Sequence, residues 1–310
     1  MKDHKMSSQA DIRKDRLLLQ NPYAHLNPEG RFSCAVATPT RYDLQNPYAY
    51  LNGAGKFDSE VVATTIAPSP HIFYFGPQRA SVEKSAHALQ RELWKHRKSI
   101  FGSTEVKPLT VIDPKAAATI LGLTMEEVNP LPWATNESGN FEVAGLFNRA
   151  EKRISISNRL PRSTWRFTAS HELGHYILHP GVVELHRDKP LDGSEDVLAP
   201  NAVERQANWF AAAFLMPQKL VTQEFVARFG TALPLKISKD IAFGLARGRY
   251  LELLPPKITA KKLAFELASS IYFHGESFES LTTVFSVSTS AMAYRLLELG
   301  LIDTQALKTA

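Results

Sequence analysis

Apolar residues recur at helical spacing in several separate segments of the chain. The first pattern begins at Ala80, and basic residues at 95–98 load its C-terminal end, where the helix dipole favours cations. A second, shorter helix is predicted to start after Asp113, which can cap it, with Pro114 in its first turn. Because glycine often ends helices, we expect this one to stop near Gly122.

A period-two alternation predicts two strands in the middle of the chain. Residues 143–147 and 153–158 alternate between apolar and polar side chains, with Ile154 and Ile156 on one face. Residues 148–152 (Asn-Arg-Ala-Glu-Lys) form a polar turn between them, so the strands are predicted to form a β-hairpin. The rest of the chain has mainly helical periodicity, in segments at roughly 163–178, 201–215, 260–273 and 278–299.

The first 80 residues differ from the rest in composition and contain an internal repeat. They are rich in Asn, Pro, Gly and Ser, and the sequence of residues 19–27 returns almost unchanged at 44–52. Asn-Pro with an aromatic residue after it favours turns over long helices. The simpler interpretation is a poorly ordered tail. The alternative is a pair of short linear motifs that dock on a partner or on the body of the protein.

Composition and charge set wide limits on the class of protein. Of the 310 residues, 44% are hydrophobic and 22% charged, which is typical of one large globular domain or two modest ones. The net charge of +5 permits an acidic partner or nucleic acid without requiring one. The single cysteine, Cys34, excludes an intramolecular disulfide and a cysteine-based zinc site. With no apolar run long enough for a signal peptide or a membrane span, we expect a cytoplasmic protein.

The clearest chemical signal is an H-E-x-x-H motif inside the helix predicted at 163–178. His171 and His175 are four residues apart, so both imidazoles lie on one helix face and can reach one metal ion. Glu172 is rotated by about 100° around the helix, beside the open position of that ion. There its carboxylate can take a proton from water and pass it to the leaving amine. The alternative is an ordinary exposed helix that matches the motif by chance.

A third metal ligand must come from outside the motif. The longer pattern H-E-x-x-H-x-x-G-x-x-H is excluded, because Leu178 and Gly181 stand at its last glycine and histidine. Glu204 is our candidate, since it shares a helix face with the apolar stripe at 207–214, where an uncompensated carboxylate is costly. The alternative is a capping box with Asn201. Other candidates lie in a polar loop: Glu184, His186, Asp188, Glu195 and Asp196.

Two more polar residues lie near the predicted ligands. Asn208, one turn after Glu204, is a candidate to accept the ring N–H of a ligating histidine. His179 continues the four-residue series but lies about 12 Å along the helix axis from His171. Because Pro180 comes directly after it, we interpret His179 as a residue that caps the end of the helix.

Two segments together resemble a known family. Residues 166–179 (Arg-Phe-Thr-Ala-Ser-His-Glu-Leu-Gly-His-Tyr-Ile-Leu-His) and 204–217, which run from Glu204 to a Met-Pro pair, closely resemble the ImmA/IrrE metallopeptidases. The similarity extends from about residue 85 to about residue 302. It implies zinc held by the two motif histidines and Glu204, and cleavage of transcriptional repressors that control mobile elements or stress genes. The repeated N-terminal tail departs from the family pattern.

The C-terminal helices offer a competing function. Residues 278–285 and 289–299, joined by a short polar turn, are typical of a helix-turn-helix. The second helix carries one cation, Arg295, where a DNA-binding helix would present several basic and amide side chains. We therefore expect this helix to pack on the domain. The competing hypotheses are a non-enzymatic DNA-binding regulator with a structural zinc, and an adaptor directed by the N-terminal repeats.

Together these patterns predict an α+β protein with a zincin-like core, in which a small β-sheet accompanies the motif helix. We expect a tail over residues 1–80, a zinc metallopeptidase core over 81–220 and a helical region over 221–310. The predicted activity is that of an endopeptidase acting on a protein substrate.

Overall fold

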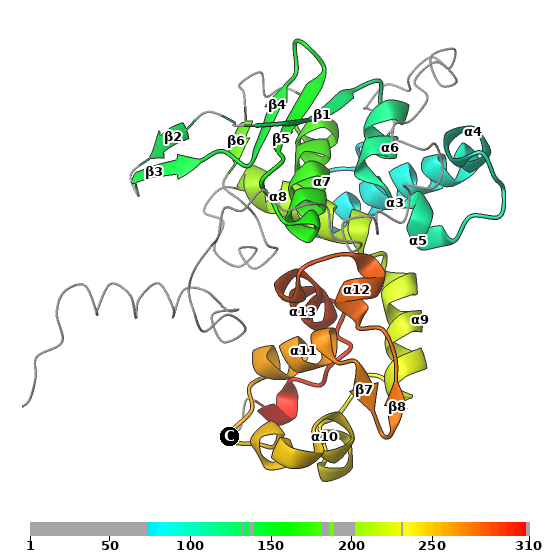
Figure 1. Ribbon diagram of the computed structural model, residues 1–310, viewed down its shortest axis with the longest axis vertical. Coiled ribbons are helices and arrows are strands. Elements are labelled where there is room, and N and C mark those ends of the chain that lie inside the picture. Colours follow the sequence, from blue (N-terminus) through cyan, green and yellow to red (C-terminus); the bar gives the residue numbers. More distant parts are fainter. Residues whose placement is uncertain are drawn as a thin grey trace, which may run out of the picture. The chain divides into compact units, whose positions relative to one another are not determined.

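The computed structural model describes residues 73–129, 131, 133–136, 139–180, 186–188, 202–230 and 232–307 (Figure 1). Both copies of the N-terminal repeat lie outside these residues, as do most of the predicted tail and the acidic part of the 184–196 loop. The interpretations given to those segments, and the three-part division of the chain, stay predictions.

Helices open the described part of the chain, in the order α3 (Arg79–Lys95), α4 (Arg97–Phe101), α5 (Pro108–Val111) and α6 (Pro114–Ile120). The longest, α3, buries an apolar face that includes Leu89 and Leu93. The predicted cap of α6 is confirmed, because the Asp113 carboxylate accepts a hydrogen bond from the Ala116 N–H at 3.0 Å. Just beyond the end of α6, Gly122 has a φ of +68°, a conformation that favours glycine.

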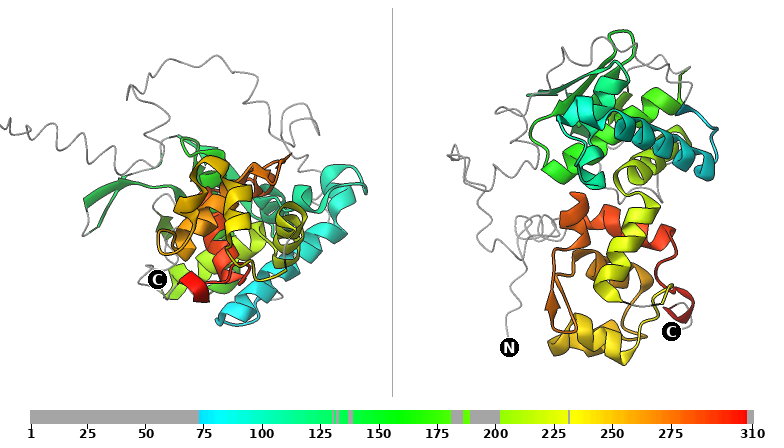
Figure 2. Two further views of the ribbon diagram at one scale, coloured as in Figure 1. Left: turned by 90° about the horizontal axis from the view of Figure 1, so that it is seen from below. Right: turned by 90° about the vertical axis from the view of Figure 1, so that its right-hand side faces the viewer.

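A four-stranded sheet has the order β1 (Thr124–Val128), β5 (Arg153–Ser157), β4 (Gly145–Asn148) and β6 (His186–Asp188). The predicted hairpin is confirmed: β4 and β5 pair antiparallel, from Gly145 opposite Ile156 to Asn148 opposite Arg153. β1 joins the other side of β5 in parallel register. A separate two-stranded sheet pairs β2 (Trp133–Asn136) antiparallel with β3 (Gly139–Glu142) (Figures 1 and 2).

The motif helix α7 (Arg162–Leu178) lies between this sheet and helix α8 (Ala202–Leu215). Every residue of α7 from Trp165 to Leu178 is buried, which excludes the alternative of an ordinary exposed helix. α8 in turn packs on α3. Gly174 permits the close approach of α7 to α8, because a Cβ there would lie 3.2 Å from both Ala207 Cα and Phe210 Cβ. The fold is thus a helix-rich α+β arrangement with a small sheet, as predicted.

The remainder is mainly helical, with α9 (Gln218–Phe229), α10 (Lys239–Leu245), η4 (Arg247–Leu253), α11 (Ala260–Ser269), β7 (Tyr272–Phe273), β8 (Glu276–Ser277), α12 (Leu281–Phe285), α13 (Thr289–Glu298) and η5 (Gln305–Leu307). The helix predicted over 260–273 was too long. It ends at Ser269, because His274 and Gly275 adopt left-handed conformations, with φ of 48° and 100°, and turn the chain into a β7–β8 hairpin.

The helix pair α12–α13 is joined by a tight turn in which Ser286 is left-handed, and Ser288 caps α13. Every residue of α13 is buried or half-buried, and Met292 and Leu296 lie in the core. Arg295, the one cation of α13, is only 1% exposed. Its guanidinium is therefore not available to a phosphate group, which weakens the DNA-binding hypothesis. Among the helices of the described ranges, none is long and apolar enough to cross a bilayer.

Candidate metal centre

The two motif histidines meet at their Nε2 atoms inside the protein. His171 and His175 are fully buried, and their Nε2 atoms lie 2.8 Å apart. Their ring centroids are separated by 4.5 Å with the planes at 74°. This convergence is a consequence of the four-residue spacing on one face of α7.

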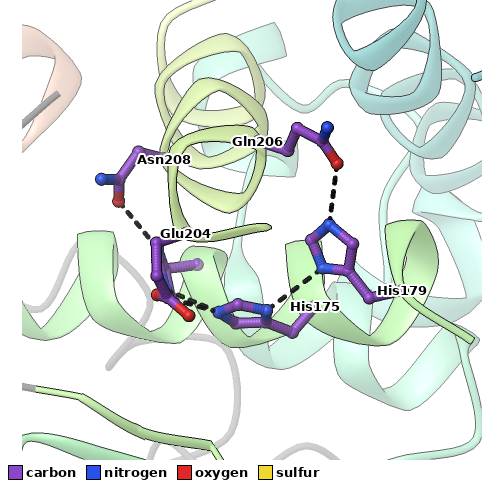
Figure 3. A network of polar contacts seen from close by, with 6 residues as sticks. His175, His179, Glu204, Gln206 and Asn208 are labelled. Atoms are coloured by element: carbon purple, nitrogen blue, oxygen red, sulfur yellow. Dashed lines mark hydrogen bonds and ion pairs between the residues drawn. The ribbon is translucent and has the colours of Figure 1, made fainter. Parts of the chain in front are cut away.

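Glu204 completes the cluster from α8. Its Oε2 lies 3.1 Å from His171 Nε2 and 3.4 Å from His175 Nε2. One ligand atom from each of these three residues lies within 4.8 Å of the others. Figure 3 shows the glutamate reaching across from α8 toward α7. The structure thus brings together the three residues predicted as ligands, while the side chains of the alternative loop candidates, at 184–196, lie outside the described residues.

Asn208 occupies the position predicted for it. The Nδ1–H of His171 donates to Asn208 Oδ1 at 2.8 Å, and both residues are buried. A neutral imidazole carries one N–H, so this bond leaves His171 Nε2 with a lone pair that faces the cluster. The arrangement is the one that a histidine ligand requires.

The residues present fit a divalent metal ion. Two imidazole nitrogens and one carboxylate oxygen are the usual donors of a catalytic zinc site. In the metal-binding tautomer all three are electron-pair donors, and donors within 3.4 Å of each other repel unless a cation lies between them. Tetrahedral ligation with bonds of about 2.0–2.1 Å needs ligand atoms a little over 3 Å apart, so the two nitrogens have to separate by a few tenths of an ångström.

Glu172, the predicted general base, is fully buried but does not belong to the three-residue cluster. Its carboxylate lies against β4, where a Cβ added to Gly145 would be 2.7 Å from Glu172 Oε1. The same Cβ would meet Thr168 Cγ2 at 2.8 Å. Gly145 therefore leaves the space that the glutamate fills. Glu172 thus points in a different direction from the two histidines, as its position one residue after His171 requires.

Arg149, in the turn between β4 and β5, holds the end of the motif helix. One guanidinium nitrogen donates to the carbonyl oxygens of His175 and His179, both at 3.1 Å. The guanidinium also lies over the rings of Phe147 and Tyr176, at 4.9 Å and 5.3 Å from their centroids. Burial lowers the pKa of Arg149 and raises the pKa of Tyr176. A cation at a helix C-terminus donates to the last carbonyls, and here it adds a second donor to the His175 carbonyl, which also accepts from the His179 N–H.

His179 and Gln206 are part of the site, although the sequence did not connect Gln206 with it. His179 does come directly after the last helical residue, as predicted, and its N–H bonds to the His175 carbonyl at 3.2 Å. Its ring does more: Nδ1 lies 3.2 Å from His175 Nδ1, and Nε2 lies 3.0 Å from Gln206 Oε1 (Figure 3). The usable sequence signal was the polar stretch from Glu204 to Asn208, which only Ala207 interrupts, ahead of the apolar remainder of the helix.

The geometry defines a mixed α+β domain in which two buried histidines and a half-buried glutamate form a cluster that could hold a metal ion. Residues 135–237 match the model of the Peptidase_M78 family, described as the IrrE N-terminal-like domain. The resemblance to the ImmA/IrrE family is thereby confirmed, over a shorter segment than the predicted 85–302.

A curated phage protein is similar to part of this chain. The "Uncharacterized immunity region protein 2" of Bacillus phage phi105 is 30% identical over 98 residues. The matched segment is 31% of this chain and 56% of the phage protein, so the match spans about half the length of that relative. The similarity supports the family assignment and leaves the activity of the whole chain to be proposed.

Proposed function

We propose that the protein is a zinc-dependent endopeptidase in which His171, His175 and Glu204 hold the metal. The observation that carries the proposal is the meeting of three electron-pair donors at one point, two from buried histidines and one from the half-buried Glu204. When bound, zinc supplies a Lewis acid that lowers the pKa of water to about 7. The chain's own contribution is a rigid ligand set, held by Asn208 on one side and by the packing of α7 on α8.

In this proposal Glu172 is the general base. It takes a proton from the attacking water and delivers it to the leaving amine, so one carboxylate serves both proton transfers. Its position directly after His171 on α7 supports this role, as does its burial, which keeps the carboxylate out of bulk water. Gly145 leaves room for that carboxylate, since a larger residue there would collide with it.

The proposed substrate is a protein, and the resemblance implies a transcriptional repressor. The name of the phage relative, an immunity region protein, agrees with a role in the control of a mobile element. A cytoplasmic location and a part in stress-linked transcription belong to the same proposal. The burial of Arg295 favours a peptidase over the alternative of a DNA-binding regulator.

The test compares wild type with Glu172→Gln, both shown to contain zinc. Each is incubated with extract of the host cell, and new protein N-termini are identified by mass spectrometry. We expect new termini with wild type that are absent with the variant and with chelator-treated wild type. Equal cleavage by Glu172→Gln would overturn the assignment of the base, and the absence of new termini with zinc-loaded wild type would count against a peptidase.

A further inference from the structure

A hydrogen-bonded chain lies behind His175, on the side away from the cluster. It runs from His175 Nδ1 to His179 Nδ1, 3.2 Å away, and from His179 Nε2 to Gln206 Oε1, 3.0 Å away. Both imidazoles are buried, with His179 8% exposed. Figure 3 shows Gln206 and Asn208 on opposite sides of α8, with Gln206 reaching toward His179, the residue directly after α7.

The direction of this chain is set by its last member. Gln206 Oε1 is an amide oxygen and can only accept, so the proton of that bond is on His179 Nε2. In a neutral imidazole, which carries one N–H, this assignment leaves His179 Nδ1 as an acceptor. The short contact between the two Nδ1 atoms then requires His175 to donate. The remaining nitrogen of His175, Nε2, is left with a lone pair that points into the cluster.

Helix geometry explains why the two ligands are supported differently. At about 100° per residue, Asn208 lies on nearly the same face of α8 as Glu204, and it reaches His171 directly. Gln206 is rotated by about 200° from Glu204 and bonds to His179 in place of His175. His179 lies between Gln206 and His175 and links them by hydrogen bonds. Arg149 fixes the backbone of His175 and His179 by donating to their carbonyls.

We propose that Gln206 and His179 are positioning residues that select the metal-binding tautomer of His175, as Asn208 does for His171. This inference rests on the proposed metal site. It predicts that substitutions of two residues that do not touch the ion lower the zinc affinity of that site. A purely structural role, in which His179 only ends the helix, would need its backbone N–H but no particular ring nitrogen.

The direct test is the tautomeric state of each imidazole, read from long-range ¹H–¹⁵N spectra of the zinc-loaded protein. We expect His179 to carry its proton on Nε2, and His171 and His175 to carry theirs on Nδ1. A proton on Nδ1 of His179 would overturn the proposal, because the ring could then not accept from His175. In Gln206→Leu we expect the His179 signals to show exchange between both tautomers.

Zinc affinity, measured by competition with a chromophoric chelator, gives the second test. His179→Phe keeps an aromatic ring and the backbone N–H but removes the acceptor, and we expect affinity to fall about 10- to 100-fold. Gln206→Leu should lose less, since His179 remains. Gln206→Glu, which keeps an acceptor oxygen, should restore affinity close to wild type. The matched control is His96→Phe, which changes a half-exposed histidine at the C-terminal end of α3.

The outcomes separate this inference from the proposed function. Wild-type affinity in a folded His179→Phe protein, judged by an unchanged thermal midpoint without metal, would overturn the positioning role and leave the metal site standing. Failure of wild type itself to bind zinc would overturn the proposed function, and the positioning role with it. A loss in His179→Phe that Gln206→Glu does not share supports both.

Discussion

Two buried polar networks in this protein differ in where their positive charge comes from. The first surrounds Arg295, whose Nε donates to the Met216 carbonyl at 3.1 Å and whose Nη1 lies 2.9 Å from the Glu83 carboxylate. Glu298, 3.3 Å from the same nitrogen, is also paired with Arg79 at 2.6 Å. This network joins α3, the end of α8 and α13, and the chain itself supplies its cation.

The second network, on α7 and α8, brings two imidazole nitrogens and a carboxylate oxygen to one point, and none of these three groups carries a fixed positive charge. The difference between the networks is energetic. A buried network that includes its own counter-charge holds elements together, whereas one that gathers electron-pair donors is costly until a metal ion joins it. The first is therefore expected to serve stability and the second function, and variants in each should separate the two.

The largest expected effect on stability comes from the first network. Arg295→Met keeps most of the side-chain volume but leaves Glu83, Glu298 and the Met216 carbonyl without their shared donor. Breaking a buried ion pair on one side costs about 3–5 kcal/mol, and the partial exposure of the carboxylates points to the lower end. Chemical denaturation measures the loss, and the zinc content of the folded fraction should not change. Loss of zinc with unchanged stability would reverse the roles of the two networks.

Gly174→Ala should affect both properties at the contact between α7 and α8. The new Cβ would lie 3.2–3.3 Å from the backbone and Cβ atoms of Ala207 and Phe210, so the helices must move apart. Overpacking of this kind costs about 1–3 kcal/mol, and the shift moves Glu204 away from the histidines. We expect weaker zinc binding in chelator competition. A variant with wild-type affinity would show that the site does not depend on this close approach.

Removing the carboxylate of the second network should raise the stability of the metal-free protein, by less than the changes above lower it. Glu204→Gln removes a negative charge and can donate an N–H to a histidine nitrogen. The metal-free variant should therefore be more stable than metal-free wild type, by about 1 kcal/mol. Thermal unfolding of both proteins in chelator tests this. A clear destabilisation would mean that Glu204 contributes to the fold and not only to the site.

The smallest effect concerns His87, which lies on α3 near Arg295. Burial is the main cause of its lowered pKa, Arg295 and Arg91 lower it further, and Glu83 partly opposes them. The folded state therefore binds this proton less readily than the unfolded state, whose pKa is about 6.5. Stability should fall as pH drops below that value and level off below the folded pKa. His87→Gln should flatten this part of the pH profile, and an unchanged profile would contradict the assignment.

Local patterns were enough to predict much of the core and the three residues that meet in the candidate metal centre. The hairpin, the Asp113 cap and the motif helix are consequences of alternation, capping chemistry and helical spacing within a few residues. Glu204 was identifiable because a carboxylate on an apolar stripe needs a partner. Each of these signals lies within a short stretch of the sequence, so no knowledge of the packing between distant elements was required.

Features that depend on packing between elements were missed. Residues 124–128 have no clean alternation, and β1 exists because it pairs in parallel with β5. The contact of Gln206 with His179 depends on how closely α7 and α8 approach, which Gly174 determines. Likewise, the burial of Arg295 depends on Glu83, which is 212 positions away in the chain.

The most direct test of the central claim is zinc stoichiometry by elemental analysis of wild type and Glu204→Ala, with Glu83→Ala as a carboxylate control from the other network. We predict about one zinc per chain in wild type and in the control, and little or none in Glu204→Ala. Zinc retained in full by Glu204→Ala would contradict the assigned ligand set, and a wild-type protein without zinc would contradict the metal site itself.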